Sequence, residues 1–150
     1  MLVYRVGKTQ FIHDLEGVGS KLFGGRWNHE GFGCIYTSEN RALAVLEYLV
    51  NASIEYIPKT LSLATFEIDD AHIESVSLKD LPKNWQSIPA SFTTKNYGTD
   101  KLKRGVPCFR IPSVVIQQEF NYIINPQAGN HFFKSVDVQD FVYDVRLSDR

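Results

Sequence analysis

The sequence predicts an α+β fold built on a mixed or mostly antiparallel sheet. The chain has 150 residues, 43% of them apolar, and a domain of this size buries about two thirds of the surface of its unfolded chain. Strand-like segments are unevenly spaced and gather late in the chain, a pattern that argues against regular βαβ winding. No repeat or low-complexity tract marks a boundary, so residues 1–150 are expected to form one domain.

Six segments have the short apolar runs or alternation that are typical of strands. In chain order they are residues 2–6, 33–37, 61–68, 107–111, 120–125 and 140–147. The third is expected to have a lead-in at Pro58.

Three helices are expected between these strands. The strongest runs from about Glu39 to Ser53, with Ser38 as its N-cap. Two weaker helices are also expected. The first covers residues 77–81 and begins at a serine, and the second covers residues 94–104 and is ended by the following Gly105.

Charge and composition narrow the classes of function. A net charge of −1 and a pI near 6.4 provide no basic field for nucleic acid, so direct nucleic-acid binding is not expected. The N-terminus lacks the apolar core of a signal peptide, and no apolar run is long enough to span a membrane. We therefore expect a cytoplasmic protein without a membrane partner. Cys34 and Cys108 have neither metal-ligand spacing nor disulfide density, and both are expected to be reduced thiols.

Glu47 lies within the apolar stripe of the first predicted helix. The stripe is formed by Ala42, Leu43, Val45, Leu46, Leu49 and Val50. A carboxylate that is partly removed from water needs a cation or a hydrogen-bonding partner. Glu47 therefore either lies at the edge of the stripe, pairs with an arginine for structural reasons, or belongs to a functional site, for which Arg26 is the natural partner.

Arg26 lies in a glycine-rich segment, GGRWN, that matches neither a P-loop nor a dinucleotide fingerprint. The glycines allow either a mobile loop with tight turns or close approach of the backbone to a ligand. An arginine fork beside Trp27 suits an anionic ligand that carries a ring. Tyr36 either stacks on such a ring or packs in the core.

Residues 111–126 carry a third group of polar side chains, among them Ser113 and Asn121, in an otherwise apolar run. Ser113 follows a proline, which is also typical of a simple turn. No nucleophile elbow surrounds Ser113, so a serine hydrolase is not expected. The histidines are scattered without ligand spacing, and no metal site is expected.

These pieces occur in a specific order along the chain. YR lies near the start, followed by GGRWN, IYTSE, a helix with A-x-x-x-x-E-x-L, then PS and E-x-N-Y-I-I-N-P. From Tyr4 to Leu147 this set resembles the RES-domain toxins of bacterial RES–Xre toxin–antitoxin modules. The arginine, tyrosine, glutamate and serine of the family motif fall on Arg26, Tyr36, Glu47 and Ser113.

The resemblance implies an ADP-ribosyltransferase-like fold, with a mixed sheet core and flanking helices, and NAD as the substrate. It implies that Glu47, Arg26 and Tyr36 are catalytic, with the nicotinamide–ribose bond as the bond cleaved. Arg26, Trp27, Tyr36, Ser113 and Asn121 would contact NAD, and Ser113 would do so as a hydrogen-bonding group.

The resemblance leaves two alternative roles for Arg5, the arginine of the YR pair. It would be either a second phosphate contact or a structural ion-pair partner.

The acceptor of the ADP-ribose group is left open by the sequence. Water or phosphate would make the protein an NAD glycohydrolase or phosphorylase, whereas a side chain would make it a protein ADP-ribosyltransferase. A non-enzymatic nucleotide-binding or partner-binding module is the further alternative, favoured if Glu47 were exposed and remote from Arg26. The resemblance also implies a cognate Xre-type helix-turn-helix antitoxin as partner.

Overall fold

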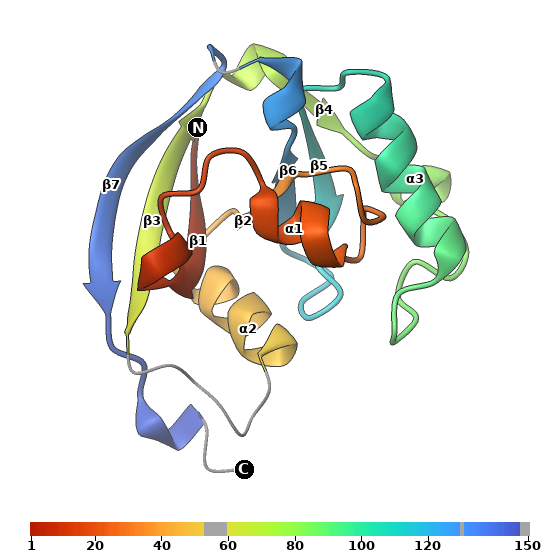
Figure 1. The fold of residues 1–150 in the computed structure, drawn as a ribbon. Helices are drawn as coiled ribbons and strands as arrows, with labels where there is room; N and C mark the ends of the chain where they lie inside the picture. The colour runs from red at the N-terminus through yellow and green to blue at the C-terminus, as the bar shows by residue number, and fades with distance from the viewer. Residues whose placement is uncertain (53–59, 130, 148–150) are drawn as a thin grey trace.

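A seven-stranded sheet is the centre of the fold, as the computed structural model shows for residues 1–52, 60–129 and 131–147 (Figure 1). The strands are β1 (Leu2–Lys8), β2 (Ile35–Ser38), β3 (Leu61–Ile68), β4 (Ile73–Ser75), β5 (Cys108–Pro112), β6 (Phe120–Ile124) and β7 (Phe133–Phe141). Their order across the sheet is β4-β5-β6-β2-β1-β3-β7. The β4–β5 pair is parallel and the other pairs are antiparallel, so the predicted α+β fold with a mixed sheet is confirmed.

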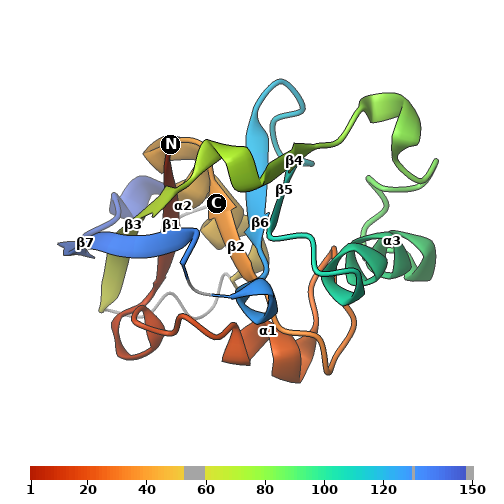
Figure 2. The ribbon, with the colours of Figure 1, turned by 90° about the horizontal axis from the view of Figure 1, so that it is seen from above.

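Among the described residues, three α-helices flank the sheet: α1 (Val18–Phe23), α2 (Arg41–Asn51) and α3 (Phe92–Lys103). Figure 1 shows β7, β3 and β1 side by side at one end and β6, β5 and β4 toward the other, with α3 beyond β5. Seen from above, α1 and α3 lie on the same side of the β2–β6–β5 part of the sheet (Figure 2). Single 3₁₀ turns connect the elements at Thr9–Phe11, Asp70–His72, Leu78–Asp80, Pro126–Ala128 and Val145–Leu147.

The two faces of the sheet pack against different parts of the core. Because side chains alternate along a strand and cross-strand partners share a face, Tyr36 and Ser38 of β2 lie on the same face as Asn121 of β6. This face carries the Trp27 core and the packing against α2. The opposite face carries the core around Val3 and Phe66. The polar residues of the predicted site on β2 and β6 therefore share one face.

Helix α2 begins later than predicted, and its cap is a different residue. The N-cap is Asn40, whose Oδ1 accepts a 2.8 Å hydrogen bond from the backbone N–H of Leu43. The expected cap, Ser38, is instead the last residue of β2. Both side chains suit an N-cap, and strand pairing with β6 decided between them. The helix ends at Asn51, while Ser53 and Pro58 lie outside the described residues.

The apolar stripe of α2 is narrower than predicted. Leu43 and Ala44 are its buried residues, whereas Ala42 and Val50 are exposed. Glu47 lies four residues after Leu43 and three after Ala44, so it stays on the inward side of the helix and is half-buried.

The strand predicted at 140–147 is wrong. The strand there is β7, which pairs with β3 and ends at Phe141, and a 3₁₀ turn follows at Val145–Leu147. Because β7 is an edge strand with mostly exposed side chains, its polar residues hide the alternation that marks a half-buried strand.

The other predicted strands match within a few residues at their ends, and residues 61–68 match β3 at both ends. The sequence did not predict the three-residue strand β4 or the six-residue helix α1. Both are too short to show a period, and α1 begins after Gly17 and ends before Gly24, which have positive φ values of 69° and 71°.

The remaining predicted helices have different outcomes. Residues 77–81 form only a 3₁₀ turn, Leu78–Asp80, because Pro82 follows closely and Ser77 makes no capping bond. The helix predicted at 94–104 is α3, which begins at Phe92 because Ser91 Oγ accepts from the Thr94 N–H at 3.1 Å.

Candidate active site

Glu47 is hydrogen-bonded through one carboxylate oxygen to two residues distant in the sequence. Its Oε1 accepts from Ser113 Oγ at 2.6 Å and from Asn121 Nδ2 at 2.7 Å. A half-buried carboxylate on the inward side of α2 is thus matched by two neutral donors. Within residues 1–52, 60–129 and 131–147, the second oxygen, Oε2, has no hydrogen-bond partner and remains available to a ligand.

Ser113 is fully buried in the turn that follows β5. While its Oγ donates to Glu47, it accepts from the backbone N–H of Val115 at 3.0 Å and of Ile116 at 3.2 Å. A hydroxyl has one proton to donate and two acceptor positions, and all are used here. This arrangement holds Glu47 and leaves the Ser113 hydroxyl without free capacity for nucleophilic attack.

Arg26 is anchored by backbone carbonyls of a distant segment. Its Nη1 donates to the carbonyl oxygens of Trp85 at 2.9 Å and Ser87 at 2.8 Å. Burial lowers the pKa of Arg26, and the nearby charge of Glu47 opposes that shift, as Tyr36 does to a smaller extent. Arg26 and Glu47 therefore act on one another electrostatically, although the ion pairs among the described residues include no direct contact between them.

The hydroxyl of Tyr36 is fixed to the GGRWN segment. It donates to Asn28 Oδ1 at 2.5 Å and accepts from the Trp27 N–H at 3.0 Å. Burial raises the pKa of Tyr36 well above its usual range, with a further rise from Cys34 and a small opposing effect of Arg26. The phenol is therefore a neutral hydrogen-bonding group at neutral pH.

Gly25 is required by this close contact. A Cβ atom at Gly25 would lie 2.5 Å from the Tyr36 hydroxyl oxygen, closer than any side chain tolerates. Of the two interpretations of the glycines, the structure thus shows close approach of the backbone at Gly25, but to the Tyr36 side chain.

Trp27 lies in the core. Its ring is 3% exposed and packs edge-on against Tyr97 with ring centroids 6.1 Å apart. Trp27 is therefore part of the core of this face, and its contact with NAD stays a prediction.

Arg5 is separated from Glu47 by the sheet. Strand alternation places it on the opposite face from Tyr36 and Asn121, and its Nη1 donates to the Asp14 carbonyl at 3.4 Å. Burial lowers the pKa of Arg5, and the Asp14 charge partly opposes this shift. These contacts hold Arg5 on that face of the sheet, and its role as a phosphate contact stays a prediction.

Sequence reasoning missed two side chains of the site. Asn28 is fully buried, donates to the carbonyl oxygens of Ser20, His29 and Phe32, and holds Tyr36. Ser38 Oγ donates to Asn121 Oδ1 at 2.8 Å. Asn28 could have been found because it belongs to GGRWN, whereas Ser38 was taken for a helix cap. The Trp85 and Ser87 carbonyls belong to the backbone and leave no signal in the sequence.

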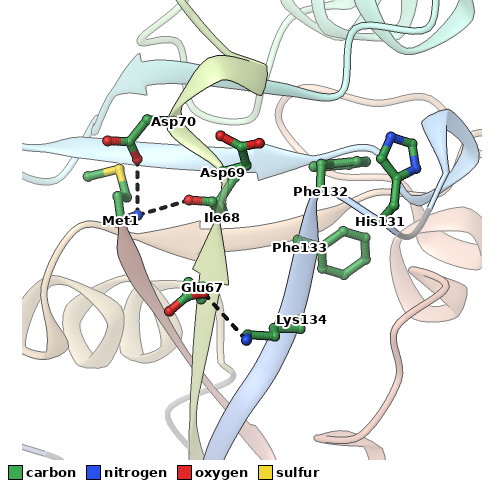
Figure 3. A pocket seen from close by; sticks show the side chains of 9 residues that line it. All are labelled: Met1, Glu67, Ile68, Asp69, Asp70, His131, Phe132, Phe133 and Lys134. Atoms are coloured by element: carbon green, nitrogen blue, oxygen red, sulfur yellow. Dashed lines mark hydrogen bonds and ion pairs between the residues drawn. The ribbon is translucent and has the colours of Figure 1, made fainter.

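A separate hollow lies at the end of β3 and contains none of the predicted site residues (Figure 3). It is lined by Met1, His131 and residues 67–70 and 132–134. The Met1 ammonium donates to Asp70 and to the Ile68 carbonyl, and Lys134 pairs with Glu67, so these charges are matched within the hollow. We do not assign it to the active site.

Three further observations concern metals, thiols and membranes. In the part of the chain that the structure describes, no three His, Cys, Asp or Glu residues are grouped so that they could hold a metal ion. Cys34 and Cys108 are both buried free thiols, as predicted. None of the described helices is long and apolar enough to cross a membrane.

The fold matches a chain of the Mycobacterium tuberculosis MbcT–MbcA toxin–antitoxin complex with a TM-score of 0.76 over 93% of this chain and 83% of that chain. At 16% sequence identity, this likeness concerns the fold.

The sequence comparisons are more specific. Residues 2–146 match the RES domain, and the chain belongs to the RES domain family. It is 32% identical over 151 residues to Toxin Res of Yersinia enterocolitica, covering 98% of this chain and 99% of that protein. It is also 30% identical over 145 residues to the Prs ADP-ribosylating toxin of Sphingobium sp., covering 93% of this chain and 90% of that protein.

Proposed function

We propose that this protein is the toxin component of a toxin–antitoxin system and depletes NAD by cleaving the nicotinamide–ribose bond, with water or phosphate as acceptor. The observation that carries the proposal is the Glu47 carboxylate, which is held by Ser113 and Asn121 through one oxygen and lies in the electrostatic field of Arg26. Membership of the RES domain family and the relatives named as toxins support the same function.

Glu47 is the catalytic residue of this proposal. When the C–N bond breaks, its electron pair stays with nicotinamide, which leaves as a neutral molecule, and positive charge develops on the ribose. A fixed carboxylate stabilises that charge, and its free oxygen can accept a hydrogen bond from a ribose hydroxyl or from the attacking nucleophile. Because the leaving group needs no proton, the mechanism needs no general acid.

Arg26 and Tyr36 bind and orient NAD. The Nη1 of Arg26 is held by two carbonyls, while Nε and Nη2 make no hydrogen bonds to the described residues and can meet the pyrophosphate. Tyr36 has its hydroxyl fixed and its side chain half-buried, so the remaining exposed part of the ring can contact nicotinamide.

Transfer of ADP-ribose to a protein is the second candidate. The observation that favours it is the relative from Sphingobium sp., whose name describes an ADP-ribosylating toxin. Both reactions use the same NAD site and differ only in the acceptor.

A non-enzymatic binding module fits the site less well. It would be favoured by a solvent-exposed Glu47 remote from Arg26. Glu47 is instead half-buried, doubly hydrogen-bonded and electrostatically linked to Arg26.

Product analysis tests the proposal and separates the acceptors. The purified chain would be incubated with NAD in phosphate-free buffer, in phosphate buffer and with a cell lysate, and the products identified by mass, with Glu47→Gln as the inactive control. We expect free ADP-ribose or, with phosphate, a phosphorylated ADP-ribose. ADP-ribose attached to a lysate protein would favour the second candidate, and intact NAD in all three reactions would refute both.

The expected partner is an antitoxin, and we propose an Xre-type helix-turn-helix protein in a cytoplasmic module. The MbcT–MbcA structure is a toxin–antitoxin complex with a chain of this fold. We propose that the antitoxin covers Arg26 and presents a carboxylate to it in place of the NAD phosphates.

A further inference from the structure

We propose that Ser38 is a positioning residue that acts on Glu47 through Asn121, an inference that rests on the function proposed for Glu47. Ser38 Oγ donates to Asn121 Oδ1 at 2.8 Å, and Asn121 Nδ2 donates to Glu47 Oε1 at 2.7 Å. The two bonds form one directed chain from a strand hydroxyl to the carboxylate.

The sheet register brings the first two members together. Ser38 is directly opposite Asn121 in the antiparallel pair of β2 and β6, so their side chains share a face. Ser38 is 3% exposed, which shields its hydroxyl from competing water. The contact is therefore built into the sheet.

The hydrogen bond from Ser38 matters because the two ends of the Asn121 amide are chemically different. An asparagine side chain has an oxygen that only accepts and a nitrogen that only donates. The Glu47 carboxylate only accepts, so Nδ2 faces Glu47 and Oδ1 faces Ser38. The Ser38 hydroxyl donates to that Oδ1 and thereby holds the amide in place from its other end. Without this hydroxyl, Oδ1 would lose its donor and the amide would be held at Glu47 alone.

The orientation of Asn121 determines how Glu47 presents its free oxygen. Ser113 and Asn121 both bind Oε1, and two donors on one oxygen define the plane of the carboxylate better than one. Loss of one donor should misplace Oε2 relative to the ribose without removing any contact to NAD. The change should therefore appear in kcat rather than in KM.

Steady-state kinetics of Ser38→Ala test whether the change affects kcat and leaves KM unaltered. We expect kcat to fall about tenfold while KM stays within about twofold, and Ser38→Thr, which keeps the hydroxyl, to restore kcat to within about threefold. Ser62→Ala is the matched control. Ser62 lies on β3, is 1% exposed and shares a 2.8 Å hydrogen bond with Thr9 of the turn Thr9–Phe11, away from Glu47. An equal loss of kcat in Ser62→Ala and Ser38→Ala, or an unchanged kcat in Ser38→Ala, would overturn the proposal.

A double-mutant cycle tests whether Ser38 acts through Asn121. In the Asn121→Leu background, Ser38→Ala should change kcat by less than about twofold, because the intermediary is already absent. Independent, multiplying effects of the two substitutions would overturn the proposed route.

A measurement without NAD separates this inference from the proposed function. The side-chain amide signals of Asn121 in ¹H–¹⁵N spectra should shift in Glu47→Gln and in Ser38→Ala, return toward their wild-type positions in Ser38→Thr, and stay in place in Ser62→Ala. Unmoved signals in Ser38→Ala would refute the role of Ser38 whether or not the protein consumes NAD. Wild-type protein that leaves NAD intact while these shifts occur would refute the proposed function alone.

Discussion

Ser113 Oγ donates a 2.6 Å hydrogen bond to Glu47 Oε1 across 66 positions of sequence. The bond joins α2 to the turn after β5, and the backbone N–H groups of Val115 and Ile116 hold the same hydroxyl from the other side. Ser113 thereby holds the Glu47 carboxylate in place, and its direct contact with NAD stays a prediction.

Ser113→Ala should lower kcat by about ten- to a hundredfold, the equivalent of losing a hydrogen bond to a charged group. It should also cost about 1–3 kcal/mol of unfolding free energy, because the Glu47 carboxylate loses a donor and two backbone N–H groups lose their acceptor. Steady-state kinetics and urea unfolding measure the two effects. A variant with wild-type kcat would contradict the supporting role.

Glu47→Gln should abolish NAD loss while the protein stays folded. The glutamine oxygen can still accept from Ser113 and Asn121, but the negative charge at the reacting ribose is gone, and we expect a loss of about a thousandfold or more. Mass analysis of NAD consumption and a thermal melt check both halves of the prediction. Unchanged turnover in the folded variant would refute the mechanism.

Arg26→Lys should weaken NAD binding about tenfold or more and lower the unfolding free energy by only about 1 kcal/mol. An ammonium group lacks the planar fork that serves the Trp85 and Ser87 carbonyls and a phosphate at the same time. Calorimetry in the Glu47→Gln background avoids turnover during the titration. If Arg26→Lys bound NAD as tightly as the protein with Arg26, Arg26 would not be a phosphate contact.

Stability should fall as pH rises above about 9, because burial raises the pKa of the Cys34 and Cys108 thiols to about 12. In the unfolded chain a thiol ionises near its ordinary pKa of about 8.5, so above that pH the unfolded state releases protons that the native state retains. Each thiol then lowers the unfolding free energy by up to about 1.4 kcal/mol per pH unit. Urea unfolding between pH 7.5 and 10 should show this decline.

Cys34→Ala is the matched test of the pH dependence. It should reduce the decline in stability per pH unit, whatever its own cost at pH 7.5. A slope identical to that of the wild type would show that Cys34 does not contribute.

Expression of this chain alone should arrest growth and lower cellular NAD, and coexpression with the cognate antitoxin should restore both. If the antitoxin covers Arg26, the complex of the antitoxin with the Glu47→Gln toxin should no longer bind NAD. A complex that binds NAD as tightly as the free Glu47→Gln protein would refute occlusion and place the restraint on the acceptor side.

The α+β class, the strand at 61–68 and the inward position of Glu47 could be predicted from the order of the residues. These features follow from local periodicity, in which side chains three or four apart share a helix face and alternate residues share a strand face. The polar edge strand β7 and the short helix α1 lack such a period, and the sequence missed them.

The contacts of the polar residues depend on how distant segments of the chain pack together. Ser38 and Asn40 are equally good caps by residue type, and the pairing of β2 with β6 assigned one to Asn121 and the other to the helix. Trp27 belongs to the core and Arg5 to the opposite face because packing and strand alternation act between segments far apart in the chain. A hydrogen bond joins atoms about 3 Å apart, and only the folded backbone brings Ser113 and Asn121 within that distance of Glu47.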